Sequence, residues 1–83
     1  MRMNDFTIKT PKQLGAVLRG YRTSKKLSQQ GVGMRAALPQ PIISKIESNS
    51  GRIALSRLLK VLAALDLELV VRPRSKTNTS AEW

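Results

Sequence analysis

Residues 27–47 decide the fold: LSQQGVGMRAALPQPIISKIE. Ser28 is a favourable N-cap for a helix that should run from residue 29 to about residue 37. Pro39 disfavours helical conformation at the residue before it, so the helix ends there. A second helix is expected over residues 40–48, because proline is tolerated at the entrance and in the first turn of a helix. The stretch therefore predicts two short helices joined by a tight turn.

Small and apolar residues in this stretch lie where two crossing helices must touch. Gly33 permits a close approach of the second helix to the first, because it carries no side chain. Gly31 has no such explanation, and at about 1 kcal/mol relative to Ala it should soften the first helix. The residues expected to face inward are Val32, Ala36, Ile43 and Ile46.

Helices are also expected on both sides of this unit. Thr10, Pro11 and Gln13 form a capping box with proline in the first turn, which predicts a helix from there to about residue 24 or 25. A last helix should span about residues 55–65. The expected apolar stripes are Leu14, Val17, Leu18 and Tyr21 on the helix before the unit, and Leu55, Leu58, Leu59, Leu62 and Leu65 on the helix after it.

The segment after the last helix changes its periodicity. Residues 67–72 read LELVVR, which alternates as a strand does, and Pro73 ends the pattern. A single strand needs a partner for its backbone hydrogen bonds, either residues 5–9 or the same strand of a second subunit. We favour the second subunit, because a chain of this size has little core of its own. The dimer strand would contain Leu67, Leu69, Val70 and Val71.

The composition indicates one basic domain that binds a polyanion. The chain has 83 residues and a formal net charge of +10, and residues 19–60 hold nine basic residues and one acid. Neither Cys nor His occurs, so disulfides, zinc fingers and the usual general base are excluded. We expect no enzyme activity, no metal, no cofactor and no membrane span. The expected location is cytoplasmic and nucleoid-associated.

Several of these residues carry a resemblance to a known family. Residues 27–29, then Val32, Gly33 and Ala36, then residues 43–47 resemble the helix-turn-helix of Cro/C1, or XRE-type, regulators without a gap. The resemblance implies a mainly α fold, a lambda-repressor-like bundle of four to five short helices, followed here by the expected strand. The chain departs from the family at Ala37, where Gly is usual, and in having two prolines in the turn.

In that family the second helix of the motif enters the DNA major groove with its leading residues toward the bases. By position, the resemblance implies base contacts from Gln40, Pro41, Ile42, Ser44 and Lys45. Gln40 suits adenine, and Lys45 suits guanine. The expected phosphate contacts are Ser28, Gln29, Lys26, Asn49 and Arg52.

Glu47 is the one acid between residues 19 and 60. Arg22 stands where the family often has an arginine that pairs with this glutamate. The resemblance therefore implies a structural ion pair between Arg22 and Glu47, and it would leave Arg22 less available for phosphate.

Features outside the motif resemble HipB-type antitoxins. They are Thr-Pro-x-Gln-Leu over residues 10–14, LELVVRP over residues 67–73, and a tail that ends in Trp83. This resemblance implies a homodimer with paired strands, a palindromic operator in its own promoter, and a HipA-type serine/threonine kinase toxin contacted by Trp83. Two alternatives are a plain phage-like repressor without a toxin and a non-specific basic RNA-binding protein.

The expected organisation is an arm or short strand (1–9), the DNA-binding domain (10–66), the dimerisation strand (67–72) and a flexible tail (73–83).

Overall fold

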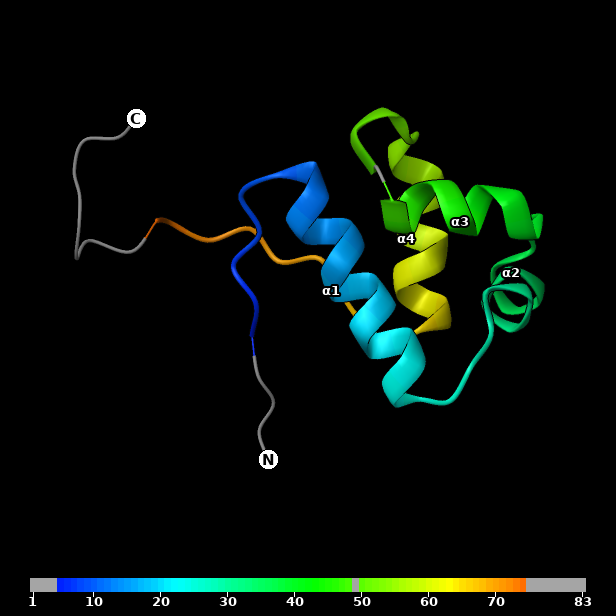
Figure 1. Ribbon diagram of the computed structural model, residues 1–83. Helices are drawn as coiled ribbons and strands as arrows, with labels where there is room; N and C mark the ends of the chain where they lie inside the picture. Colours follow the sequence, from blue (N-terminus) through cyan, green and yellow to red (C-terminus); the bar gives the residue numbers. More distant parts are fainter. Residues whose placement is uncertain (1–4, 49, 75–83) are drawn as a thin grey trace.

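The computed structural model describes residues 5–48 and 50–74, and in these residues it contains four α-helices and one 3-10 turn (Figure 1). The helix predictions are confirmed to within about one residue at each end. The elements are α1 (Pro11–Ser24), α2 (Gln29–Ala36), α3 (Gln40–Ser48), η1 (Ser50–Arg52) and α4 (Leu55–Ala64).

The capping box starts α1 as the sequence predicts. The hydroxyl of Thr10 accepts a hydrogen bond from the backbone N–H of Gln13 at 3.1 Å, and the Gln13 side chain accepts from the backbone N–H of Thr10 at 3.2 Å. Two N–H groups that the first turn leaves without a helical acceptor are thereby satisfied.

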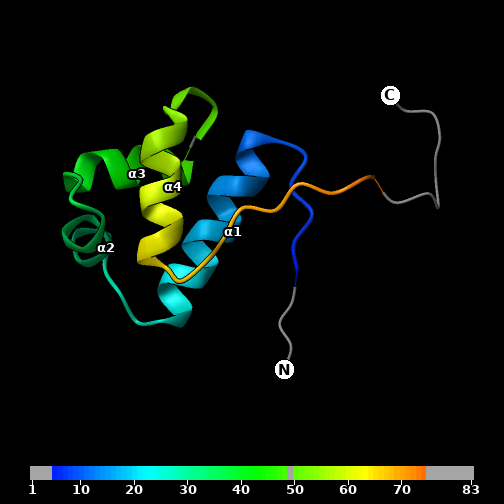
Figure 2. The same ribbon diagram turned by 180° about the vertical axis from the view of Figure 1, so that it is seen from behind.

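The helices enclose one aliphatic core. Figures 1 and 2 show α3 lying across the other helices, and α3 contacts both α1 and α2, while α2 also packs against α4. The four inward residues predicted from the central stretch are all buried. The core consists of Leu18, Val32, Ala36, Ile43, Ile46, Val61, Leu62 and Leu65.

The apolar stripe of α4 differs from the prediction in its first turn. Leu55 and Leu59 are 59% and 44% exposed, whereas Val61, which was not predicted to face inward, is 2% exposed. The face that packs against the core consists of Leu58, Val61, Leu62 and Leu65, which follow the spacing i, i+3, i+4, i+7. Leucine occurs on both candidate faces of this helix, at Leu55 and Leu59 and at Leu58 and Leu62, so the two faces were hard to separate from the sequence.

Two close approaches between backbones hold α3 in place. A Cβ atom on Gly33 would overlap the backbone carbonyl of Leu38, as expected for the small residue of the motif. A Cβ atom on Gly15 would overlap the backbone carbonyl of Glu47, so α1 and α3 touch there without a side chain between them. The close contact at Gly15 was not predicted from the sequence; the available signal was that Gly15 lies two turns before Arg22, on the same face of α1.

The two end segments form no strand within the described residues of one chain. Residues 5–9 and 67–74 pass beside each other in Figures 1 and 2, where Arg72 Nη1 lies 3.5 Å from Asp5 Oδ2. The Phe6 ring packs edge-on against Tyr21 of α1, with 5.9 Å between ring centroids. The alternative in which residues 67–72 pair with residues 5–9 is therefore wrong, because these contacts are side-chain contacts and supply no backbone ladder. Pairing with the same segment of a second subunit stays a prediction.

Candidate nucleic-acid interface

The turn between α2 and α3 keeps its tight geometry although Ala replaces Gly. Ala37 adopts the left-handed conformation, with φ 58° and ψ 43°, and the N–H of Leu38 donates to the Gly33 carbonyl at 2.9 Å. The Pro39 carbonyl then accepts from the N–H of Ile42 at 3.0 Å, which begins α3. The two prolines are thus accommodated, and the alanine carries a backbone strain that glycine would not.

The start of α2 is capped as predicted. The Ser28 hydroxyl accepts from the N–H of Gly31 at 2.9 Å. A Cβ atom on Gly31 would meet only the Ser28 hydroxyl at 3.3 Å and Leu27 at 3.7 Å, so no backbone approach requires glycine at this position.

The α3 helix has one buried face and one open face. Ile43 and Ile46 are 1% and 2% exposed and fix the helix against the core. Gln40, Pro41 and Lys45 are exposed, so three of the expected base-contacting residues lie on the open face. The other two, Ile42 and Ser44, are partly buried, and Ile42 packs against the core.

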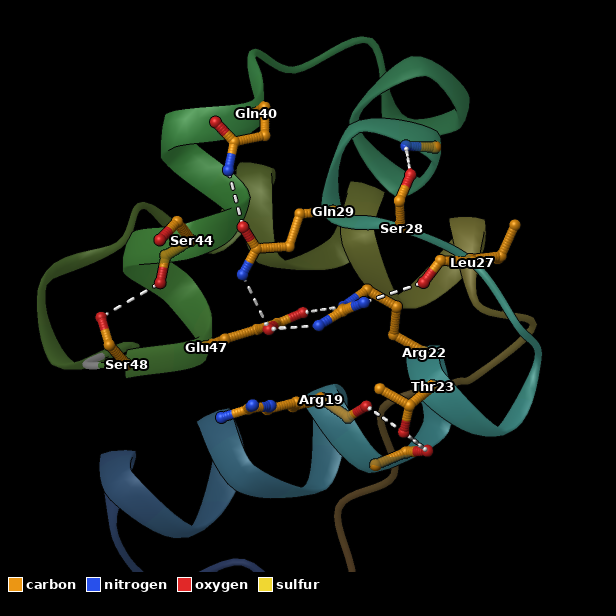
Figure 3. Close-up of polar contacts among 12 residues, drawn as sticks. Arg19, Arg22, Thr23, Leu27, Ser28, Gln29, Gln40, Ser44, Glu47 and Ser48 are labelled. Atoms are coloured by element: carbon orange, nitrogen blue, oxygen red, sulfur yellow. Dashed lines mark hydrogen bonds and ion pairs between the residues drawn. The ribbon is translucent and has the colours of Figure 1, made fainter.

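The Gln40 amide is held by a neighbouring amide from α2. Its Nε2 donates to Gln29 Oε1 at 2.6 Å, and Gln29 Nε2 in turn donates to Glu47 Oε1 at 3.1 Å (Figure 3). Gln29 therefore connects the two ends of α3, and its side chain retains one N–H for a phosphate oxygen.

Arg22 and Glu47 form the ion pair between α1 and α3. Arg22 Nε lies 2.5 Å from Glu47 Oε2 and Nη2 lies 3.1 Å from Oε1, while Nη1 donates to the Leu27 carbonyl at 2.8 Å (Figure 3). The side chains are only 12% and 7% exposed. The hydrogen bonds from Arg22 to Glu47 raise the pKa of the guanidinium, and this outweighs the opposite effect of burial.

The remaining phosphate candidates are placed differently. Lys26 is exposed in the loop before α2 with a φ of 59°, and Arg52 is exposed in η1 after α3. The hydroxyl of Ser28 is engaged as a cap, and its O–H can still donate to a phosphate. Asn49, like Trp83, lies outside the described residues.

Most of the basic charge in this region has no acidic partner within the protein. Of the nine basic residues between positions 19 and 60, only Arg22 and Lys25 form ion pairs in the described part of the chain, with Glu47 and Asp66. The other seven form no ion pair there, although Arg35 Nη1 donates to the Ala64 carbonyl at 3.5 Å, so their charge is not neutralised by an acid and can attract a polyanion. The residues that the structure describes contain no cluster of three or more His, Cys, Asp or Glu, and none of their helices is long and apolar enough to cross a bilayer.

Comparison with protein families gives a match over most of the chain. A helix-turn-helix family model matches residues 18–71, which include α2, the turn, α3 and α4. The chain belongs to this helix-turn-helix family. It is a DNA-binding transcriptional regulator of the Cro/C1 type, and that family is typically non-enzymatic.

A relative among curated proteins is the uncharacterized HTH-type transcriptional regulator y4dL of Sinorhizobium fredii. The two are 40% identical over 57 residues, which are 69% of this chain and 29% of the relative. This helix-turn-helix chain thus spans less than a third of that protein's length.

Solved structures of helix-turn-helix proteins share the fold. HipB in the complex of HipA, HipB and O2-O3 superposes with a TM-score of 0.81 at 22% identity, covering 86% of this chain and 100% of that chain. The restriction-modification controller protein C.AhdI of Aeromonas hydrophila superposes with a TM-score of 0.64 at 32% identity, covering 69% and 86%.

Proposed function

We propose that this protein is an antitoxin that represses its own operon as a homodimer. It would bind a palindromic operator and neutralise a HipA-type serine/threonine kinase toxin. The observation that supports sequence-specific binding is the open face of α3, where Gln40 and Lys45 are exposed beside a core that fixes the helix. Such a face can enter a major groove while unpaired cations contact the phosphates on either side.

In this proposal Gln40 reads adenine and Lys45 reads guanine, with Pro41 and Ser44 beside them and Ile42 against a thymine methyl group. Lys26, Ser28, Gln29, Asn49 and Arg52 contact phosphates. The decisive experiment is selection of bound sequences from random duplex DNA at physiological salt. A palindromic consensus is expected, with half-sites about 34–36 Å apart. Recovery of sequences without a consensus would support non-specific binding instead.

Exposed apolar side chains support the dimer. Leu69, Val70 and Val71 are 56%, 64% and 92% exposed in the single chain, and Leu55 and Leu59 of α4 are also exposed. Three consecutive exposed apolar side chains favour association. We propose that residues 67–72 become a strand when the same segment of a second subunit supplies the missing hydrogen bonds.

The toxin assignment is supported by a similarity in fold that extends over the full length of solved HipB chains. The sequence adds Trp83, a residue type common among interface anchors. The test is co-expression with a HipA-type kinase from the same genome. The wild-type chain should relieve growth arrest by the kinase and Trp83→Ala should not, although both repress the operator equally.

A plain transcriptional repressor without a toxin is the second candidate. Its support is the 32% identity to a restriction-modification controller and the 40% identity to an HTH-type regulator. Operator binding and repression without any effect on a co-expressed kinase would favour this candidate.

A further inference from the structure

We propose that Glu47 sets the base preference of Gln40, acting through Gln29. This inference rests on the proposed sequence-specific DNA binding. The Glu47 side chain is 7% exposed and faces the protein, so it is a positioning residue and not a contact to DNA. Two hydrogen bonds connect it to Gln40 on the open face of α3: Gln29 Nε2 donates to Glu47 Oε1 at 3.1 Å, and Gln40 Nε2 donates to Gln29 Oε1 at 2.6 Å (Figure 3).

The chemistry of the carboxylate fixes the direction of both bonds. Beside the Arg22 guanidinium, Glu47 is an ionised carboxylate, which can only accept. Gln29 must therefore turn its NH₂ toward Glu47, and its carbonyl oxygen then faces the other way. That oxygen also can only accept, so Gln40 must turn its own NH₂ toward Gln29.

The orientation of Gln40 determines what it can offer to a base. One N–H is used by Gln29, which leaves one N–H and the carbonyl oxygen on an exposed side chain. Adenine presents one acceptor, N7, and one donor, N6–H, in the major groove and matches this pair. Guanine presents two acceptors, N7 and O6, and would require both N–H groups of Gln40.

Substitution of Glu47 by Gln should reverse the donor and acceptor roles in both hydrogen bonds, Glu47–Gln29 and Gln29–Gln40. Arg22 donates to both oxygens of Glu47, and its shorter bond is to Oε2, the oxygen that Gln29 does not contact. The new amide should therefore keep its oxygen at the Oε2 position and place its NH₂ at the Oε1 position, which faces Gln29. Gln29 then turns over and donates to the carbonyl oxygen of Gln40. Both N–H groups of Gln40 would face outward, which is the arrangement that suits guanine.

The test measures DNA affinity of the full chain for two duplexes that differ at one base pair. The operator is the selected consensus, and the base pair is the one at which Gln40→Ala loses discrimination. Wild type should prefer A·T over G·C there by about 5- to 150-fold. Glu47→Gln should lower this ratio at least fivefold or invert it. The control Gln30→Met, at an exposed neighbour outside the series, should keep the wild-type ratio.

A folded Glu47→Gln protein with the wild-type ratio would overturn the proposal. If circular dichroism shows that this variant does not fold, Gln29→Met replaces it, since it removes both bonds and leaves the ion pair. An unchanged ratio in Gln29→Met would then overturn the proposal. Loss of sequence preference in the wild-type chain itself would refute the proposed function and this inference together, whereas a selective wild type with a selective Glu47→Gln refutes only the inference.

Discussion

Gly15 of α1 lies against the backbone carbonyl of Glu47 at the end of α3, where a methyl group would overlap both the oxygen and the carbon of that carbonyl. The contact brings the α1 backbone directly beneath the recognition helix. Seven residues later on the same face, Arg22 reaches the side chain of the same Glu47. Glu47 therefore contacts α1 at two points: its backbone carbonyl packs against Gly15, and its carboxylate binds Arg22.

Gly15→Ala should destabilise the protein by about 2–3 kcal/mol, because the added methyl group forces two backbones apart. Gly20→Ala is the matched control in the same helix, since a Cβ atom there has nothing within 4 Å. It should stabilise by about 0.5–1 kcal/mol through the better helix propensity of Ala. Urea unfolding followed by circular dichroism measures both. Equal effects of the two substitutions would contradict the close contact.

Ala37→Gly should stabilise the protein by about 1 kcal/mol. Ala37 has a φ of 58°, a conformation that costs an L-residue about 1–2 kcal/mol and costs glycine almost nothing. Ala16→Gly is the control, because Ala16 is exposed in the interior of α1, where the same substitution should cost about 0.5–1 kcal/mol. The two midpoints of thermal unfolding should move in opposite directions.

Arg22→Met should cost about 3–5 kcal/mol, since it leaves the buried carboxylate of Glu47 without its cation. The double variant Arg22→Met with Glu47→Leu should recover most of this loss, because neither charge then remains buried. Chemical unfolding of both variants gives the comparison. The raised pKa of Arg22 means that its contribution to stability is present at every pH below the usual value for arginine and is lost only above it. Raising the pH within the range below the usual pKa of arginine should therefore not weaken the ion pair.

Arg52→Ala should weaken DNA binding by a similar factor on every sequence. Arg52 is exposed in η1 and is proposed to contact a phosphate. Loss of one such contact should reduce the slope of log affinity against log salt by about 0.9. Arg57→Ala, an exposed cation on α4, is the control and should leave the slope unchanged. A change in sequence preference with Arg52→Ala would contradict its assignment to a phosphate.

Val71→Asp should impair the dimer, because the carboxylate would be placed within the proposed strand pair, where an apolar group is needed. Sedimentation equilibrium should show association weakened by at least tenfold. Gln30→Asp adds the same charge at an exposed position of α2, outside the proposed interface, and should leave association unchanged. A dimer of normal strength in Val71→Asp would show that residues 67–72 do not form the interface.

The sequence was sufficient where a local rule determines the structure. The capping box at Thr10, the cap at Ser28 and the helix ending before Pro39 depend on neighbours within a few residues, and each lies where the pattern placed it. The inward positions of α2 and α3 were also correct, because the spacing of four residues from Val32 to Ala36 and of three from Ile43 to Ile46 places each pair on one face of its helix.

Other features depend on contacts that the sequence does not encode locally. The face of α4 could not be chosen while leucine occupied both alternatives, and packing against α2 decided it. The need for glycine at position 15 arises from a helix more than thirty residues away. The bond from Gln29 to Glu47 likewise follows from the crossing of α2 and α3, which no spacing in the sequence reveals. A strand at residues 67–72 requires an edge that one chain does not supply.

The Glu47 carboxylate binds both Arg22 and Gln29, and this has a consequence for how copies of this gene would diverge. Pro41 and Lys45 make no side-chain hydrogen bond or ion pair within the described part of the chain, so mutation there would change the preferred promoter without harming the fold. At position 47 most replacements would be eliminated through misfolding before any new promoter preference could be selected. Duplicated regulators should therefore acquire separate targets first through the outer positions of α3, and only later at the base pair that Gln40 is proposed to contact.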